Sequence, residues 1–467
     1  MLGCGSLAFA WSGNRPSPGF GRLPERIGGQ PELRRKARLQ RSAGTRTPAN
    51  ERRTPLWTLK VTQMLLFAAN VCFARFITVY YDHIGLSRKL MGFLLVVTPM
   101  MSFVGGMFWS IVVDITGKYK LILTSSGLLA VALVFSYLLP AVGKSWPLLL
   151  GITFVQGFLT SPAGPVVDGL CLKVLKEQTG PQEKKEEYGD QRLWSAVGWG
   201  GMAIAAGKLV DMYGVNAIFF CYGILVCINV LVIQLFISDA PKAARQGQTT
   251  VSTRQWLKTL CKFEPLWMLL NLLIYGILIA LIESFLNVFL VQDFDHAPKV
   301  IIGAATAVMC LFEIPVFKYI SSLWTKRGYS LVGVLWFAEF VMALRCLLYA
   351  VVPKTQPWLV LLIEPLHGFT FAAVWNATVE YAQRLATPGT EAKMQALING
   401  LYFNVAFAVG SLLWGYWSQM PPAGFGFKRC FLIDAALTLI WLVIWAAGFA
   451  LARARRRSKA RLSQNVG

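Results

Sequence analysis

Residues 265–291 read PLWMLLNLLIYGILIALIESFLNVFLV, and this stretch decides the fold. As a helix it covers about 40 Å, which exceeds the roughly 30 Å hydrocarbon core of a bilayer. Glu283 is the one charged residue within it. Lipid offers no partner for backbone N–H and C=O groups, so a spanning segment must be a helix or belong to a closed barrel. No alternating barrel pattern is present. The stretch therefore predicts a transmembrane helix.

Comparable apolar stretches recur along the chain and predict twelve such spans, six on each side of a polar stretch. They cover roughly 57–81, 90–113, 120–141, 146–170, 192–213, 216–238, 265–291, 299–322, 330–352, 357–383, 394–417 and 428–451. The predicted fold class is an all-α integral membrane protein with two six-helix halves that rock about a central site. The predicted domains are a basic disordered tail or transit peptide (1–55), an N-terminal half (56–238), a cytosolic linker (239–264), a C-terminal half (265–451) and a basic cytosolic tail (452–467).

The composition supports this class. The chain has 467 residues, of which 55% are apolar and only 15% charged, with a mean hydropathy of +0.52. Soluble domains carry about a quarter charged residues. A soluble enzyme, a disordered protein and a disulfide-stapled secreted domain are thereby excluded. The nine cysteines include no CxxC pair and there are only three histidines, so we expect no metal site, no disulfide framework and no cofactor.

The net charge of +22 is concentrated in the two tails, which together contribute +14. The tails lack the interleaved aromatic residues expected of a nucleic-acid site and adjoin membrane spans. We therefore expect contact with anionic lipid, and no nucleic-acid partner. With both termini on the cytosolic side, the inward loops hold seventeen Lys and Arg and the outward loops seven. This bias follows the positive-inside rule.

The N-terminal segment leaves the host membrane open. It is rich in Arg and poor in acid, which fits a plastid or mitochondrial transit peptide as well as a disordered cytosolic tail. An organelle membrane is one expectation, and the plasma membrane or another endomembrane is the other.

Charged residues inside the spans are the first candidates for function, because each costs about 2.5–3.5 kcal/mol at a helix centre. Arg345 and Glu364 lie on either side of the predicted turn between spans 9 and 10, ten and nine residues from its centre near Thr355. Equal rise per residue places them at the same depth. His367 follows Glu364 by one helical turn. We expect these three residues to couple transport to protons; the alternative is a static ion pair that locks two helices.

Further candidates for the solute site lie in spans 1, 7, 8, 10 and 11. Glu313 precedes Pro315, which should bend span 8. Glu283 and Arg75 lie in the outer halves of their spans and could pair with each other or meet solute. Arg75 could also extend outward so that its charge reaches the membrane surface. The polar candidates are Asn70, Asn376 and Asn399, together with Tyr80, Tyr402 and Asn404. Asp168 and Arg192 are expected in a cytosolic gate. Glu339, off the face of Arg345, is expected to have a local partner, and Asp434 to be peripheral.

At the turn between spans 2 and 3, Asp114, Gly117 and Lys118 resemble the acidic-glycine-basic loop of the major facilitator superfamily. Ser110 and Ile115 depart from that pattern. The resemblance implies a gating role for the three matching residues. A similar pair of Trp and Gly beside cations, at Trp324 to Tyr329, occupies the equivalent turn between spans 8 and 9.

A narrower resemblance is to the lactose-permease-like branch, which includes nucleoside:proton symporters. It rests on the stretch Tyr188 to Trp199 entering span 5, Arg345 to Tyr349 in span 9, Leu366 to Phe371 in span 10, and Asn399 to Phe403 with Gly410 in span 11. This branch implies proton-coupled uptake of small polar solutes. It places Arg in span 9, His and Glu in span 10 and a solute-contacting acid in span 8, which corresponds to Glu313. Here the order in span 10 is Glu then His.

Together these features predict a monomeric secondary transporter that moves a small polar solute with protons by alternating access. No GxxxxGK[S/T] loop indicates ATP-driven transport, and no nucleophile elbow or HExxH motif indicates an enzyme. Two alternatives stay open. One is an uncoupled facilitator of the same fold, and the other is a membrane receptor or scaffold that does not transport.

Overall fold

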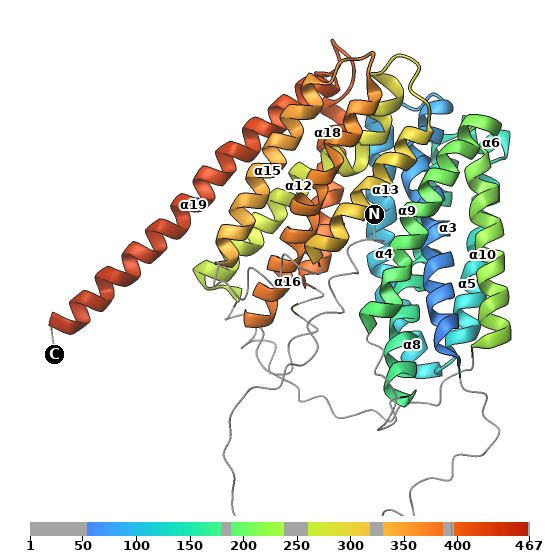
Figure 1. Ribbon diagram of the computed structural model, residues 1–467, viewed down its shortest axis with the longest axis horizontal. Helices are drawn as coiled ribbons and strands as arrows, with labels where there is room; N and C mark the ends of the chain where they lie inside the picture. The colour runs from blue at the N-terminus through green and yellow to red at the C-terminus, as the bar shows by residue number, and fades with distance from the viewer. Residues whose placement is uncertain are drawn as a thin grey trace, which may run out of the picture.

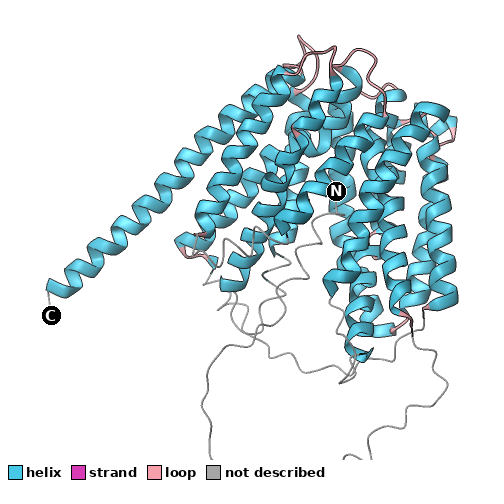
Figure 2. Cartoon of the chain, in the orientation of Figure 1, coloured by secondary structure: helices cyan, strands magenta, loops and turns pink. Residues whose placement is uncertain are grey.

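The computed structural model describes residues 54–178, 188–237, 260–317, 330–385, 394 and 397–465. Within these ranges every regular element is helical (Figure 2). Ten helices of the described residues are long and apolar enough to cross a membrane. The two remaining predicted spans correspond to α9 (Tyr188–Tyr213), which is 26 residues long but less apolar, and α13 (Val300–Pro315). The predicted end of the latter span, 318–322, lies outside the described residues.

The helices form two groups that stand side by side (Figure 1). The first half contains α3 (Leu56–His83), α4 (Arg88–Thr116), α5 (Tyr119–Ser136), α6 (Pro140–Lys144), α7 (Trp146–Thr160), α8 (Ala163–Gln178), α9 and α10 (Ala217–Phe236). The second half contains α12 (Phe263–Gln292), α13, α15 (Leu331–Val351), η3 (Pro357–Leu362), η4 (Glu364–Leu366), η5 (Gly368–Ala373), α16 (Val374–Leu385), η6 (Gly400–Ala406), α18 (Phe407–Trp417) and α19 (Phe427–Asn465). We call the end that carries the 84–87, 293–299 and 418–426 loops the outer end, following the predicted orientation.

Proline breaks span 4 into α7 and α8. The chain turns at Ser161 and Pro162, because proline has no N–H to donate and its ring clashes with the preceding turn. The carbonyl of Phe158, which would have accepted that N–H, accepts instead from Ser161 Oγ at 2.7 Å and from Trp109 Nε1 at 3.1 Å. The break is therefore satisfied within the half.

Helix α19 covers its predicted span and extends beyond it. The sequence separates a span ending at 451 from a basic tail, but the helix continues without a break to Asn465. Its 39 residues cover about 58 Å, nearly twice the hydrocarbon core. The basic residues after 452 thus extend the helix beyond the span, since Arg and Lys do not oppose helix formation.

The two halves meet closely along α4 with α18 and along α9 with α13. Glycine permits this approach: a Cβ at Gly92 would overlap the carbonyl oxygen of Ser411, and one at Gly303 would overlap that of Ala203. Asp211 of α9 accepts from the backbone N–H groups of Lys299 and Val300 at 2.6 and 2.8 Å, and so caps α13 across the boundary. These contacts lie in the outer part of the boundary.

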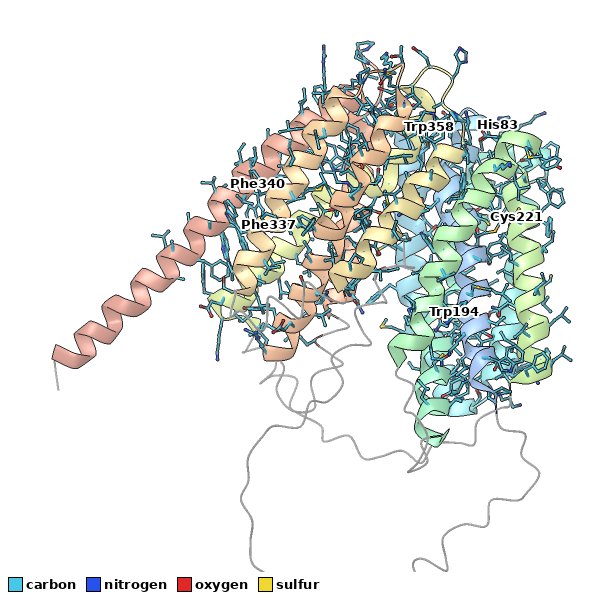
Figure 3. The ribbon with its side chains drawn as sticks, viewed as in Figure 1. His83, Trp194, Cys221, Phe337, Phe340 and Trp358 are labelled. Carbon is cyan, nitrogen blue, oxygen red and sulfur yellow. The ribbon has the colours of Figure 1, made fainter. Side chains whose placement is uncertain are left out.

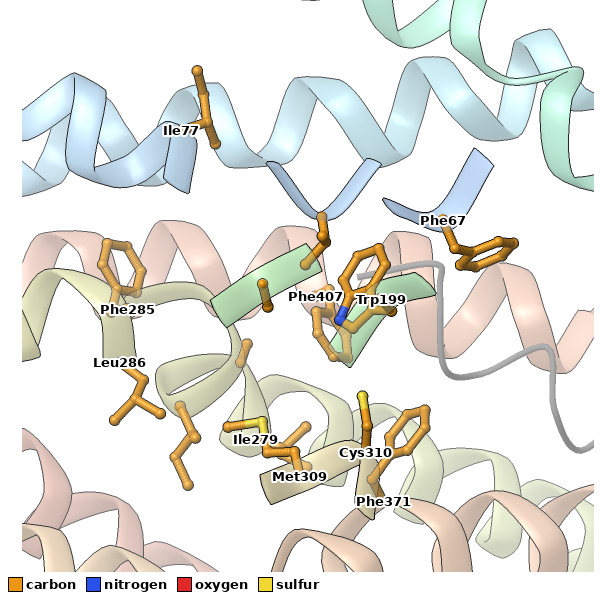
Figure 4. Packing of buried hydrophobic residues seen from close by; sticks show 14 of the residues in the cluster. Phe67, Ile77, Trp199, Ile279, Phe285, Leu286, Met309, Cys310, Phe371 and Phe407 are labelled. Carbon is orange, nitrogen blue, oxygen red and sulfur yellow. The ribbon is translucent and has the colours of Figure 1, made fainter. Parts of the chain in front are cut away.

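Large apolar side chains occur in two different surroundings, the buried interior and the exposed outer faces of the helices. Figure 4 shows Phe67 and Trp199 of the first half and Ile279, Met309 and Phe407 of the second, which are all buried members of one apolar cluster. By contrast, the set labelled in Figure 3 includes Trp194, Phe337 and Phe340, which are 40–45% exposed. Exposed aromatic side chains on long apolar helices are suited to lipid contact.

We predict that Gly303→Ala destabilises the protein, because the added methyl overlaps the α9 backbone. Overpacking of this kind costs about 1–3 kcal/mol. Gly151→Ala on α7 is the matched control, since a Cβ there meets open space. Thermal unfolding in detergent should show a lower midpoint for Gly303→Ala and no decrease for Gly151→Ala. Equal midpoints would show that the boundary can move apart without cost.

Candidate functional site

The centre of the second half holds a buried guanidinium with a complete set of partners. Arg345 of α15 donates to Glu364 Oε2 at 2.7 Å through NH2 and to the Tyr349 hydroxyl at 3.1 Å through Nε. The Tyr349 hydroxyl in turn donates to Glu364 Oε1 at 2.7 Å. Arg345 and Glu364 are fully buried. The predicted proximity of these two residues is observed, while their role in coupling stays a prediction.

His367 joins this group to two other helices. Its Nδ1 lies 3.0 Å from Arg345 NH1 and 3.3 Å from Glu283 Oε1 of α12. Its Nε2 lies 2.7 Å from Glu313 Oε1 of α13. The imidazole stacks on Phe371, with centroids 5.4 Å apart and an interplanar angle of 10°. One ring therefore contacts side chains from three helices, and its plane is fixed.

The contacts of Nδ1 are incompatible with one another in a single protonation state. Arg345 can only donate, so its contact requires a lone pair on Nδ1. The ionised Glu283 carboxylate can only accept, so its contact requires a proton on the same atom. Meanwhile Nε2 can donate to Glu313 in either state. A proton arriving at Nδ1 would therefore exchange its Arg345 contact for a bond to Glu283.

Arg75 links this cluster to the first half of the protein. Its NH2 lies 3.4 Å from Glu283 Oε2, and its backbone carbonyl accepts from Asn287 Nδ2 of α12 at 2.6 Å. Glu283 is thus shared between Arg75 of α3 and His367 of span 10. The pairing of Arg75 with Glu283 was one of the three alternatives left open by the sequence, beside contact with an acidic solute and an outward-extended side chain.

The cluster carries an excess of negative charge. Three carboxylates, Glu283, Glu313 and Glu364, face two guanidiniums, Arg75 and Arg345. With a neutral imidazole the sum is −1, and each of these side chains is at most 8% exposed. An uncompensated charge inside a membrane protein is costly. One proton, or one other cation, would bring the cluster to neutrality. Among the described residues no group is suited to hold a metal ion.

Irregular helical turns surround the cluster. The π-helical segment η5 begins directly after His367, η6 lies in the neighbouring span 11, and a π turn at 316–317 follows Pro315 and Glu313. The last of these lies at the bend predicted for span 8. In η5, the Thr370 carbonyl accepts from the Tyr275 hydroxyl of α12. Segments of this kind occur mostly where function requires displaced backbone groups.

The three predicted asparagines lie in different surroundings. Asn70 lines a pocket inside the first half with Ser126 and Asn229, and its Nδ2 donates to its own helix at the Leu66 carbonyl. It does not join the charge cluster. Asn376 Nδ2 and Asn399 Oδ1 are buried atoms of spans 10 and 11 without a hydrogen-bond partner. The Tyr402 hydroxyl and the Trp375 indole N–H are also buried without a partner.

Asp168 and Arg192 come together, as expected, at the inner end of the first half. Arg192 NH1 lies 3.3 Å from Asp168 Oδ1 and 2.9 Å from Gln63 Oε1. Gln63 Nε2 donates to Asp168 at 2.9 Å, and Ser195 donates to Gln63 at 3.0 Å. Gln63, in the middle of an apolar stretch, was missed by sequence reasoning. All of these residues belong to the first half, so their role in gating stays a prediction.

The loop between spans 2 and 3, which was predicted to take part in gating, forms the C-terminal end of helix α4. Gly117 has a left-handed φ of 66° and ends α4, a conformation that favours glycine over residues with a side chain. Lys118 is exposed. The side chain of Asp114 lies outside what the structure describes.

Sequence reasoning also missed a cluster at the outer end, which we call the outer clasp: Asp82, Arg88, Gln292, Asp293, Ser418 and Phe427. Arg88 of the first half donates to Gln292 Oε1 at 2.6 Å and to the Ser418 carbonyl, lies 3.5 Å from Asp293, and stacks 4.0 Å above the Phe427 ring. Gln292 donates back to Asp82 of the first half. Three helix ends of the second half (α12, α18 and α19) and two of the first (α3 and α4) thus meet around one guanidinium.

We predict that Arg88→Ala loosens the outer end, because it removes every contact that this guanidinium makes with the second half. Hydrogen–deuterium exchange of the protein in nanodiscs should become faster in the amides at the ends of α3 and α12, and should be unchanged at their inner ends. Lys144→Ala is the control, since Lys144 is an exposed cation of α6 at the outer end of the first half. Unchanged exchange at the outer end would show that the outer clasp does not hold the two halves together.

Comparison with known proteins identifies the family to which this chain belongs. The family model described as the MFS_1 like family matches residues 56–428. The maltose permease of Geobacillus stearothermophilus is 25% identical over 386 residues, which cover 81% of this chain and 92% of the permease. An uncharacterised transporter of Bacillus subtilis, YwbF, is 23% identical over 78% of this chain and 84% of its own length.

Solved structures agree on the fold. The nucleoside transporter NupG superposes with a TM-score of 0.71 and 15% identity, covering 84% of this chain and 98% of NupG. A bacterial homologue of the human lysosomal transporter Spinster, inward-facing and unoccupied, superposes with a TM-score of 0.60 and 13% identity over 85% of this chain and 96% of its own. The all-helical fold with ten candidate membrane spans among the described residues and the family match over most of the chain lead to one conclusion: this protein is a transporter of the major facilitator superfamily and belongs to its MFS_1 like family.

Proposed function

We propose that the protein moves an uncharged polar solute together with a proton by alternating access, and that the proton binds at the His367 cluster. The observation that carries this proposal is the position of His367 Nδ1 between Arg345 and Glu283 in a buried group of net charge −1. The site lacks one positive charge and contains an atom that can accept a proton.

Proton binding would act directly on the contact between the halves. A proton on Nδ1 forms an imidazolium, which donates to Glu283. Because the proton occupies the Nδ1 lone pair, this atom can no longer accept a hydrogen bond from Arg345. Arg345 keeps its bonds to Glu364 and Tyr349. Glu283 then divides its charge between His367 and Arg75, so the ion pair between the halves weakens. In this way the energy of proton binding is available to shift the conformational equilibrium.

The unpartnered polar groups of spans 10 and 11 favour a solute that forms hydrogen bonds. Asn376 Nδ2 and Trp375 Nε1 offer donors, Asn399 Oδ1 offers an acceptor and the Tyr402 hydroxyl offers both. The Trp375 and Tyr402 rings lie 5.9 Å apart. Buried polar atoms without partners cost free energy unless a ligand or water completes them. Since the proton neutralises the cluster, the solute itself need carry no charge. The names of two relatives, a maltose permease and a nucleoside transporter, are consistent with this solute class.

A second candidate is an uncoupled facilitator of the same fold. The closed set of hydrogen bonds among Arg345, Tyr349 and Glu364 favours it, because a static structural pair would have the same geometry. In either case we expect a monomer in the lipid membrane, with solute rather than nucleic acid as its partner.

The two candidates are separated by Glu364→Gln. The substitution raises the charge of the cluster to zero without a proton, so we expect proton uptake to stop while solute exchange persists. The purified protein in liposomes with an internal pH dye is exposed to pools of sugars, nucleosides, amino acids and organic acids. The native chain should acidify the interior with one of these pools, and Glu364→Gln should not.

Glu380→Gln serves as the control, because Glu380 pairs with Arg384 on the exposed inner surface. It should acidify the interior like the native chain. Persistent acidification by Glu364→Gln would rule out the proposed coupling, and flux of a solute without any pH change in the native chain would establish the facilitator.

A further inference from the structure

Glu339 is a buried carboxyl that the His367 cluster does not use. It lies on α15, six residues before Arg345 and so about 9 Å nearer the inner end. It is 1% exposed. Its Oε1 accepts from Asn271 Nδ2 at 2.6 Å, and its Oε2 is buried without a hydrogen-bond partner. Within the described ranges, no cation is recorded beside it.

The surroundings of Glu339 favour the protonated acid. From α12, the Asn271 amide donates to it, and the Tyr275 hydroxyl is close enough to interact with it electrostatically. Asn271 is itself held by Trp441 of α19, whose indole N–H donates to Asn271 Oδ1 at 2.6 Å. An ionised carboxylate with a single neutral donor in a membrane interior would be expensive. A neutral acid with one O–H is far less so.

A pocket lies between this acid and the inner end of the second half. Asn271 and Tyr275 line it, as does Leu335, which lies one turn from Glu339 on the same helix. The rest of the lining comes mainly from the inner ends of α12 and α16, for example Pro265 and Leu385. The acid therefore lies one turn above a pocket at the inner face and has a polar side chain of that pocket as its partner.

The same pocket also reaches toward the His367 cluster. Tyr275 donates to the Thr370 carbonyl, and the Thr370 hydroxyl accepts from Arg345 NH1 at 3.3 Å. Two residues that line the pocket thus contact the two sites. Asn271 donates to Glu339, and Tyr275 donates to Thr370, whose hydroxyl accepts from Arg345. The pocket has a volume of about 20 Å³, enough for one water molecule, and Thr378 and Tyr381 add polar side chains to its mainly apolar lining.

We propose that Glu339 is a second proton site, which exchanges its proton with the inner compartment through the pocket lined by Asn271 and Tyr275. This inference rests on the proposed proton coupling, and it places the inward release of the proton at Glu339. In the release step the Glu339 O–H bond breaks, water in the pocket takes the proton as hydronium, and a carboxylate remains until a proton from the cluster replaces it.

Asp434 provides a matched control inside the same half. It is fully buried and accepts from Cys346 Sγ at 3.3 Å, with Thr438 Oγ1 3.5 Å from its other oxygen. None of these three residues lines the pocket. The structure therefore contains two buried acids on neighbouring helices, of which one adjoins the inner pocket.

Infrared spectroscopy of the native protein in liposomes tests the proposal without any solute. The carbonyl stretch of a protonated carboxylic acid should be present, and Glu339→Gln and Asp434→Asn should each remove a different part of it. After transfer to D2O, the part lost in Glu339→Gln should shift several times faster than the part lost in Asp434→Asn. A Glu339 band that exchanges no faster than that of Asp434, or no Glu339 band at all, would overturn the proposal.

Proton flux supplies the second measurement. With the pH dye in liposomes, Glu339→Gln should slow solute-driven proton movement severalfold, while Asp434→Asn should leave it unchanged. Unchanged flux in Glu339→Gln would contradict the relay. If the native chain moves no protons at all, the proposed coupling fails, and the relay fails with it. The infrared result then stands by itself as evidence on whether Glu339 exchanges its proton with water.

Discussion

The buried guanidinium of Arg345 is the constraint on which the rest of the second half depends. A permanent cation inside a membrane protein must be surrounded by acceptors, and α15 alone supplies only the Tyr349 hydroxyl. Span 10 supplies Glu364 and His367, and it does so through 3₁₀ and π turns instead of a regular helix. The imidazole then draws in Glu283 and Glu313 from two further helices, and Glu283 reaches Arg75 of the other half.

Much of this could be predicted from the sequence, because some relations depend only on counting. The spans follow from length and hydropathy, and Arg345 meets Glu364 because a hairpin places them at equal depth. The contacts of His367 with Glu283 and Glu313 could not be found in this way, since they depend on how four separate spans pack. Arg88 resembled an ordinary loop cation, and Gln63 had no signal in an apolar stretch. Asn70 was expected in the solute site, but it faces a pocket inside the first half. The direction in which it faces depends on how α3 packs against the neighbouring helices, which the sequence alone does not reveal.

The structure also indicates which side of the protein is closed. Gly92 and Gly303 allow backbone contact between the halves in their outer part, and the outer clasp adds hydrogen bonds and an ion pair at that end. The described contacts among Asp168, Arg192 and Gln63 at the inner end lie within the first half. Glu339 and its pocket lie toward this inner end. A proton that leaves the cluster by way of Glu339 would therefore move toward the inner end, away from the glycine contacts and the outer clasp that join the halves at the outer end.

The central claim is that the His367 ring changes protonation between Arg345 and Glu283. Nitrogen-15 NMR of the histidine rings tests it most directly, because the chain has only three histidines and a His367→Gln sample identifies the relevant signal. At high pH the account predicts a neutral ring with its proton on Nε2 and a bare Nδ1. On acidification both nitrogens should become protonated, and Glu283→Gln should diminish that change. A ring that stays charged, or stays neutral, over the whole pH range in which the protein is folded would contradict it.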